Sequence, residues 1–460
     1  MLLHGACRGA SRVGAAPVTL DRTHDPDRRS WIQSANDATT DFPIQNLPLG
    51  VFKRLGTNEP QRVGVAIGEQ ILDVAACLSE GLFGPDATYA AECCREASLN
   101  PLLELGRDAA RALRRDLSEI LRVGSPAFER DHAIASRILV PTSGAELMLP
   151  VRVGDYTDFY ASIDHATNVG SMFRPDNPLL PNYKWIPIGY HGRSSSIVVS
   201  GTHVRRPVGQ TRDGAEGPPT VGATRRLDYE LEVGALVATG NALGTPISLD
   251  DAERHILGLC LVNDWSARDI QAWEYQPLGP FLAKSFSTSI SPWIVTLDAL
   301  EPFRARAYPR PADDPAPLPY LFSQQNTNAG GIDITLEVFL SSARMRDERM
   351  EPYRVSVGSF VDMYWTIAQL VAHHTSNGCN LRAGDLLASG TVSGARKESR
   401  GCLLERTWRG TEPLALPTGE TRKFLDDGDE VILRGFCERG GWPRIGFGEC
   451  RGVVLPARTP

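Results

Sequence analysis

Two glutamates separated by one residue, Glu230 and Glu232, are the most informative pair in the chain. They lie in the run 227–237, whose residues alternate as in a β-strand, so their side chains project from the same face. Neighbouring carboxylates repel each other unless water solvates them or a hard divalent cation lies between them. The pair therefore has two interpretations: a solvated strand face, or part of a metal site.

Two further acidic segments could complete such a site. Asp264 follows the apolar run 256–262, and Asp158 ends an Asp-Tyr-Thr-Asp segment seven residues before His165. If these segments converge with the glutamate pair, they bring together four carboxylates and one imidazole. A lone histidine is more often structural than catalytic. His165 can therefore be either a structural or a catalytic residue on this evidence.

Residues 264–275 predict a helix that stops before Pro277. On such a helix an acid, a cation, an amide and a phenol would share one stripe, which could bind a polar, anionic small molecule. A solvated face with an Asp–Arg pair is the alternative. The stripe consists of Asp264, Arg268, Gln271 and Tyr275. Lys284 follows among apolar residues, either with its ammonium reaching solvent or as a fixed cation in a site.

Composition narrows the class of protein. The net charge of −7 and the scattered basic residues argue against nucleic-acid and anionic-membrane partners. No apolar stretch approaches the roughly 18 residues that a membrane span needs. Nine cysteines without a C-x-x-C pair predict reduced thiols and a cytoplasmic protein. Serine-hydrolase, P-loop and dinucleotide-binding motifs are absent from the sequence.

The sequence predicts three regions along the chain. Residues 1–40 are expected to be a disordered extension, residues 41–148 a small α+β domain, and residues 149–460 a large β-rich domain. The patterns predict a hairpin from residues 63–67 and 70–73 and helices over residues 102–121, 248–257 and 361–374.

Several longer motifs resemble the fumarylacetoacetate hydrolase family. The likeness runs from about residue 41 to the C-terminus, which makes it specific. Its motifs cover residues 153–160, 165–170, 189–193, 263–271, 278–286, 378–382 and 384–391.

The resemblance implies a mainly β (α+β) fold, with a small SH3-like N-terminal barrel and a large C-terminal domain of mixed, curled β-sheets (a β-roll). It also implies a cytoplasmic homodimer that hydrolyses 4-fumarylacetoacetate, a diketo dicarboxylate, to fumarate and acetoacetate in tyrosine and phenylalanine breakdown.

The resemblance further implies a role for each matching residue. Ca²⁺ or Mg²⁺ would be held by Asp158, Glu230, Glu232 and Asp264, with Lys284 and Thr288 near a further magnesium. His165 would be the general base, oriented by Glu405. Arg268, Gln271 and Lys284 would stabilise negative charge. Substrate would contact Tyr160, Arg174, Tyr190, Gln271, Tyr275 and Thr391.

Ser287 departs from the family pattern at a position next to the expected second magnesium. The physical chemistry agrees with the family's reaction. Cleavage of a diketone by water needs a Lewis acid, a base that titrates near neutral pH, and donors for an enolate. An acylpyruvate hydrolase or a related decarboxylase or isomerase is the nearest alternative, and a non-catalytic metal- or ligand-binding protein is a second.

Overall fold

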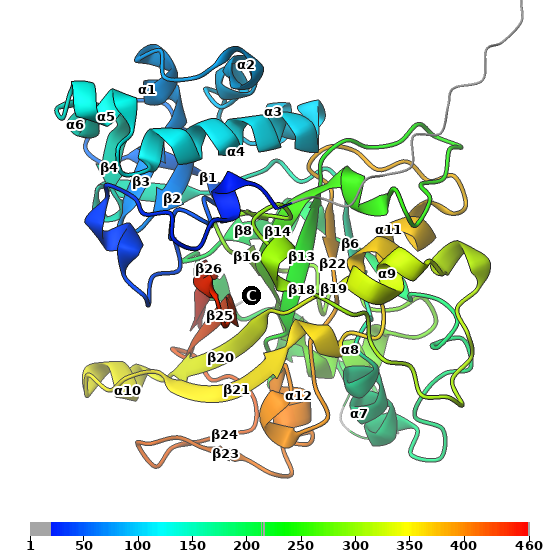
Figure 1. Cartoon of the computed structure of the whole chain (residues 1–460). Helices are drawn as coiled ribbons and strands as arrows, with labels where there is room; N and C mark the ends of the chain where they lie inside the picture. Colours follow the sequence, from blue (N-terminus) through cyan, green and yellow to red (C-terminus); the bar gives the residue numbers. More distant parts are fainter. Residues whose placement is uncertain (1–19, 213, 215–216, 459–460) are drawn as a thin grey trace, which may run out of the picture.

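The structure, a computed structural model, describes residues 20–212, 214 and 217–458 (Figure 1). It is a mixed α/β arrangement in which a helical N-terminal unit lies against curled sheets. The strands of the N-terminal sheet are β1 (Leu49–Arg54), β2 (Arg62–Ile67), β3 (Gln70–Asp73), β4 (Leu139–Pro141) and β5 (Ala145–Met148). Its helices are α1 (Val74–Ser79), α2 (Pro85–Cys93), α3 (Asn100–Leu105), α4 (Arg107–Leu121), α5 (Pro126–Arg130) and α6 (Ile134–Ile138).

The N-terminal strands pair antiparallel in the order β4-β3-β2-β1-β5. The predicted hairpin of β2 and β3 is confirmed, because Ile67 pairs with Gln70 across a turn in which Gly68 has φ +53°. The expected SH3-like closure of this sheet stays a prediction.

The single helix predicted over residues 102–121 is wrong at its start. Gly106 has φ +82°, a left-handed conformation that suits glycine, and it separates α3 from α4. The long apolar face of α4 is as expected.

Ordered structure begins well before residue 41, contrary to the predicted extension over residues 1–40. Residues 20–40 include two 3₁₀ turns, η1 (Arg22–His24) and η2 (Gln33–Asn36). Trp31 packs along α4, where its Nε1–H donates to the carbonyl of Ile120 at 2.9 Å. Trp31 is partly buried against the N-terminal core, and Ile32 and Ala35 beside it are buried in that core. The apolar burial of these residues anchors the segment. The first nineteen residues lie outside the described part of the chain.

Two larger sheets form the rest of the molecule. The first has the order β7-β6-β22-β13-β14-β16-β8, with β17 also paired to β14. The second has the order β21-β20-β25-β26-β9. The strands of the first are β6 (Tyr156–Phe159), β7 (Gly189–Gly192), β8 (Ile197–Val199), β13 (Leu231–Val237), β14 (Ile256–Asp264), β16 (Thr288–Ile290), β17 (Val295–Thr296) and β22 (Leu386–Ala388). Those of the second are β9 (Val204–Arg205), β20 (Thr335–Ser341), β21 (Tyr353–Ser359), β25 (Glu430–Arg439) and β26 (Trp442–Leu455).

Short elements connect these sheets. The two-stranded pairs are β10 (Val208–Thr211) with β11 (Thr220–Ala223), β12 (Leu227–Asp228) with β15 (Ser266–Ala267), β18 (Arg304–Ala305) with β19 (Gly331–Ile332), and β23 (Leu414–Ala415) with β24 (Thr421–Arg422). The helices are α7 (Ile163–Phe173), α8 (Arg268–Glu274), α9 (Gln324–Ala329), α10 (Ala343–Asp347), α11 (Ile367–Thr375) and α12 (Leu403–Arg406).

Two of the predicted helices are shorter than expected. Residues 248–257 contain only the 3₁₀ turn η5 (Ala252–His255), because β14 begins at Ile256 and pairs with β13. The helix predicted over residues 361–374 is α11, which starts at Ile367 after Thr366 caps it through a hydrogen bond from the Gln369 backbone N–H.

The central strands β13 and β14 are buried along their whole length, because both faces of the sheet are covered. Val233, Ala235 and Val237 face the core of the C-terminal sheets. Leu236, on the opposite face, packs in a core shared with N-terminal residues such as Leu113. The N-terminal unit therefore covers one side of the sheet that carries the acidic segments.

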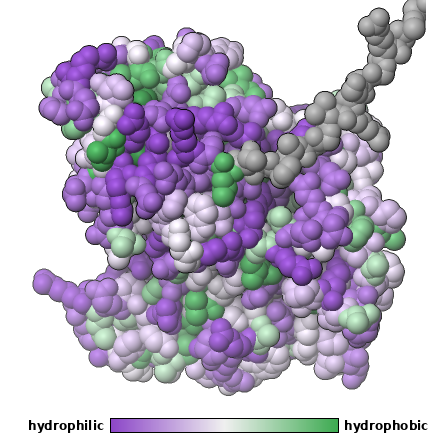
Figure 2. Space-filling model, in the orientation of Figure 1, coloured by the Kyte–Doolittle hydropathy of each residue, from purple (hydrophilic) through white to green (hydrophobic). Residues whose placement is uncertain are grey.

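On the face shown in Figure 2, hydrophilic residues dominate and hydrophobic ones form small scattered groups. No helix among the described residues is both long and apolar enough to cross a bilayer. All the cysteines in that part of the chain carry free thiols.

Candidate active site

Four carboxylates meet at one end of the sheet that contains β6, β13 and β14. Asp158 lies on β6, Glu232 on β13 and Asp264 at the end of β14, while Glu230 lies between β12 and β13. One oxygen from each lies within 4.8 Å of the others. All four residues are buried, and Glu232 and Asp264 are 0% exposed.

Strand register explains why residues so distant in sequence converge. Asp158 is aligned with Ala388 of β22, which is aligned in turn with Gly234 of β13. Glu232 is two residues from Gly234 and is therefore on the same face of the sheet. Across the strand pair, Glu232 lies opposite Val262 of β14. Asp264 is two residues after Val262 and so shares that face. Only a small residue fits at position 234, because a Cβ there would lie 2.7 Å from the Val262 side chain.

Burial excludes the interpretation of Glu230 and Glu232 as a solvated strand face. Burial, reinforced by the neighbouring carboxylates, raises the pKa of Asp158 and of Glu232 well above the ordinary range. No N–H or O–H of the described residues donates to Oδ1 of Asp158 or to either oxygen of Glu232. Buried carboxylate oxygens without donors are the ligands that a hard divalent cation prefers, so the four residues fit such a cation.

Two cations balance part of this negative charge. Arg268 Nη1 lies 2.8 Å from Glu230, and Lys284 donates to Glu230 and, at 2.8 Å, to Asp264. Burial works against ionisation of Glu230, but Lys284 and Arg268 hold its pKa below the ordinary value. Lys284 is therefore a fixed cation in a site, and the alternative of an ammonium reaching solvent is excluded.

Asp264 accepts two further hydrogen bonds, from the Tyr190 hydroxyl at 2.8 Å and from the Thr288 hydroxyl at 2.9 Å. Lys284 and Thr288 are thus partners of the carboxylate cluster. A further magnesium ion near them stays a prediction, as does the effect of Ser287.

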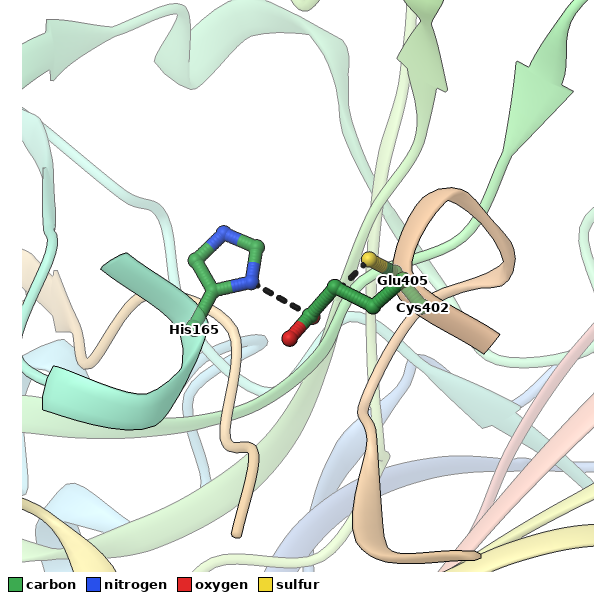
Figure 3. A group of neighbouring side chains, drawn as sticks. All are labelled: His165, Cys402 and Glu405. Atoms are coloured by element: carbon green, nitrogen blue, oxygen red, sulfur yellow. Dashed lines mark hydrogen bonds and ion pairs between the residues drawn. The ribbon is translucent and has the colours of Figure 1, made fainter. Parts of the chain in front are cut away.

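His165 and Glu405 form a buried pair (Figure 3). His165 is near enough to Glu230 for its charge to act on the pKa of that carboxylate. His165 lies on α7, whose N-cap Ser162 accepts a hydrogen bond from the His165 backbone N–H, and Glu405 lies on α12. Nδ1 of His165 is 2.6 Å from Oε2 of Glu405. Burial opposes ionisation of Glu405, but His165 and nearby donors lower its pKa to about 2. Because Glu405 is a carboxylate, Nδ1–H must donate to it. In the neutral form of the ring, the lone pair is therefore on the other nitrogen, which is directed away from Glu405 in Figure 3.

Asp228 connects the carboxylate cluster to the helix that carries Glu405, and the sequence analysis did not single it out. Its carboxylate accepts from Arg268 Nε at 2.9 Å and from the backbone N–H groups of Leu403 at 2.8 Å and Leu404 at 3.0 Å. It therefore fixes both the cation beside Glu230 and the helix that carries Glu405. Its place two residues before Glu230, in the same alternating run, was the available signal.

Three more residues around Glu405 were also missed. Asn168 donates to Oε1 at 2.8 Å, and Ser393 and Cys402 donate to Oε2 at 2.9 and 3.1 Å. Asn168 lies three residues after His165 on α7, and Cys402 lies three residues before Glu405, so these short spacings were the available signal. Ser393 has no such spacing, because it reaches Glu405 from a loop twelve residues away.

The predicted stripe on a helix over residues 264–275 is only partly correct. Asp264 belongs to β14, because it pairs with Thr288 in the sheet, and α8 begins at Arg268. On α8, Gln271 Oε1 accepts from Arg268 at 3.2 Å, whereas Tyr275 is 38% exposed.

The remaining predicted substrate residues differ in their surroundings. The ring of Tyr160 packs edge-on against His165, with centroids 5.2 Å apart. The Thr391 hydroxyl is buried without a partner among the described residues. Arg174, at the end of α7, is exposed and donates to the carbonyl of Pro178 at 3.1 Å. The structure gives Arg174 and Tyr275 no hydrogen bond to the carboxylate cluster.

Residues 155–455 match the family described as Fumarylacetoacetate (FAA) hydrolase C-terminal, and residues 45–150 match Fumarylacetoacetase N-terminal. The chain belongs to the fumarylacetoacetase family. The fumarylacetoacetase of Oryza sativa subsp. japonica is 50% identical over 432 residues, covering 93% of this chain and 97% of that protein. Those of Rattus norvegicus and Homo sapiens are each 48% identical, covering 94% of this chain and 100% of theirs. The resemblance to the fumarylacetoacetase family is thereby confirmed over nearly the whole chain.

Proposed function

We propose that the protein hydrolyses the carbon–carbon bond of 4-fumarylacetoacetate, releasing fumarate and acetoacetate. The observation that carries the proposal is the pair of His165 and Glu405 buried beside four carboxylates, in a chain about as long as the fumarylacetoacetases it matches. A base next to a hard-cation site is what hydrolysis of a diketone requires.

His165 acts as the general base. Its Nδ1–H is held by Glu405, so its Nε2 can take a proton from the attacking water. Glu405 then stabilises the imidazolium that results, because the carboxylate is already ionised. The hydroxide equivalent adds to the carbonyl carbon on the fumaryl side, and the carbon–carbon bond breaks with its electron pair leaving on acetoacetate.

The departing acetoacetate carries an enolate charge, which buried donors stabilise. Nη2 of Arg268 has no acceptor within the described part of the chain and is therefore available to this charge. Lys284, beside Glu230, adds a second positive charge. Gln271 accepts from Arg268 through its Oε1, which leaves its amide N–H₂ group to donate to the enolate oxygen. The enolate finally takes up a proton, which the His165 imidazolium can supply.

Asp158, Glu230, Glu232 and Asp264 would hold Ca²⁺ or Mg²⁺. When bound, the ion supplies the Lewis acidity that polarises the diketone oxygens. The carboxylates then need no shared protons, because the cation compensates their charge. A further magnesium near Lys284 and Thr288 is proposed from family membership.

Substrate contacts are proposed for the residues around this centre. Tyr160 packs on His165, and the free hydroxyl of Thr391 can donate to a substrate oxygen. The other members of the set are Arg174, Tyr190, Gln271 and Tyr275. A cytoplasmic homodimer and a place in tyrosine and phenylalanine breakdown are proposed from family membership.

A substrate comparison tests the function. Purified protein with Mg²⁺ or Ca²⁺ is given 4-fumarylacetoacetate or a short acylpyruvate, and the loss of diketone absorbance is followed. We expect turnover of the fumaryl substrate to exceed that of the acylpyruvate by at least about 10²-fold, because the proposed contacts include several polar residues that a larger diacid can use. Preference for the acylpyruvate would instead support the alternative hydrolase, and no turnover of either would support a binding protein.

A further inference from the structure

Three side chains of different chemistry, each able to bind a metal ion, lie together on the Nδ1 side of His165. Nδ1 of His165, Sγ of Cys402 and a carboxylate oxygen of Glu405 all lie within 4.8 Å of one another. Figure 3 shows both the imidazole and the thiol directed at the same carboxylate. All three residues are buried, and Cys402 and Glu405 are 0% exposed. This group is separate from the four carboxylates, since it shares no residue with them.

We propose that His165, Cys402 and Glu405 form an inhibitory site for a soft or borderline divalent cation such as Zn²⁺ or Cd²⁺. A thiolate, an imidazole and a carboxylate are ligands that such ions prefer, whereas Ca²⁺ and Mg²⁺ prefer oxygen alone. The chain therefore holds a hard-cation site and a softer one side by side.

The present contacts need little change to accept an ion. The atoms around Oε2 of Glu405 are Nδ1 at 2.6 Å and Sγ at 3.1 Å. Ligand atoms of a tetrahedral zinc lie about 3.2–3.6 Å apart, so shifts of about 1 Å or less would open the position. The Ser393 hydroxyl, 2.9 Å from the same oxygen, or a water molecule can complete the coordination.

Proton movements explain why the ion would inhibit. Ligation displaces the thiol proton of Cys402 to solvent. An ion on Nδ1 also moves the single proton of the neutral ring to Nε2, the nitrogen that must accept a proton from water. The base is then blocked while the carboxylate cluster keeps its own cation. Since His165 is buried and Cys402 and Glu405 are 0% exposed, the ion can enter only when the structure opens locally, and slow onset is expected.

The test separates this site from surface thiols. A background variant carries C93S and C379S, which remove the partly exposed thiols of the described residues, and C7S, which removes the cysteine outside them. With saturating Mg²⁺, CdCl₂ is titrated and the ultraviolet charge-transfer band of cadmium thiolate is recorded together with turnover. We expect one equivalent of Cd²⁺ to produce the band and to suppress turnover.

Adding C402S should remove the band and weaken inhibition by at least about tenfold, because serine can still donate to Glu405 but is a poor ligand for Cd²⁺. C450S, which changes a buried cysteine elsewhere, is the matched control and should keep the band. C402A serves as a second variant, and a thermal melt checks the folding of each. An unchanged band in both Cys402 variants, or inhibition that added Mg²⁺ relieves, would overturn the proposal. The band reports binding alone, so it distinguishes this failure from a failure of the proposed hydrolysis.

Discussion

At the scale of single residues, the site depends on opposite charges being held without water. Glu230 stays ionised beside Lys284 and Arg268, while Oδ1 of Asp158 and both oxygens of Glu232 receive no hydrogen bond from the described residues. The same chemical group therefore has two environments a few ångströms apart. One set of carboxylates is neutralised by fixed side chains, and the other is left for a mobile cation.

His165→Asn tests the base. The amide Nδ2 can replace the Nδ1–H donor to Glu405, so the fold and the cation site should persist, but no group remains to take a proton from water. We expect kcat to fall by about 10²–10⁴-fold, with Mg²⁺ or Ca²⁺ binding retained. Steady-state kinetics and metal titration measure the two effects. His203→Asn, at an exposed histidine, is the control and should leave kcat unchanged. Full activity of His165→Asn would exclude the proposed base.

At the scale of elements, the junction between β22 and β6 sets the geometry of the site. Gly390 follows β22 with φ +75°, and a Cβ there would lie 2.0 Å from the carbonyl oxygen of Phe159, next to Asp158. The close approach of these two backbones fixes the end of β6, which carries Asp158, against the segment that leads from β22 to Thr391.

Gly390→Ala should therefore disturb both stability and catalysis. The strained φ and the backbone clash each cost about 1–3 kcal/mol. We expect a loss of at least about 2 kcal/mol in the free energy of unfolding, measured by urea denaturation, together with weaker metal binding. Gly440→Ala is the matched control, because that position has open space and no positive φ. Equal stability of the two variants would contradict this view of the junction.

Some secondary-structure elements could be predicted from the sequence, and others could not. Alternation and apolar runs predicted the strands that carry Glu232 and lead to Asp264, because buried strands leave a local pattern. The break at Gly106 was missed, since a helical glycine and a helix-ending glycine look alike in one sequence. Asp264 was assigned to a helix because its i+4 spacing from Arg268 fits one, yet pairing with β16 overrides that preference.

Some residues of the site could likewise be predicted from the sequence, and others could not. The residue types and the family motifs named the four carboxylates, His165 and Glu405. The contacts of Asp228, Ser393 and Cys402 depend on segments more than a hundred residues apart meeting in space, or on which way a short turn faces. A single sequence does not encode such contacts locally. The same holds for burial of Glu230 and Glu232, which results from the N-terminal unit and the second sheet covering the strand.

At the scale of the whole molecule, one buried aspartate links the N-terminal unit to the catalytic sheets. Asp298 accepts from Arg111 at 2.8 Å and lies 3.4 Å from Arg107, both on α4, and its carbonyl lies 2.7 Å from a ring nitrogen of His24. Burial alone would raise the pKa of Asp298, but Arg107 and Arg111 hold it below the ordinary value. The folded state therefore favours the ionised form.

Asp298→Asn should destabilise the protein near neutral pH by about 2–4 kcal/mol, because it leaves Arg107 without its carboxylate. A lowered folded pKa contributes stability above the ordinary aspartate pKa of about 3.9, and that contribution is lost as the pH falls below it. The difference between wild type and variant should shrink accordingly in acid, as urea unfolding at several pH values would show. Glu348→Gln, in an exposed pair with Arg344, should change stability by less than about 1 kcal/mol. A difference between wild type and Asp298→Asn that grows in acid would contradict this assignment.

The central claim is that hydrolysis requires a hard divalent cation at the four carboxylates, next to His165. A chelator titration followed by metal addition tests it most directly, with the loss of 4-fumarylacetoacetate measured alongside the bound metal content. We expect turnover to disappear as the metal is removed and to return with Mg²⁺ or Ca²⁺ in wild type but not in Glu232→Gln. Metal-free protein that hydrolyses the diketone at an undiminished rate would contradict the claim.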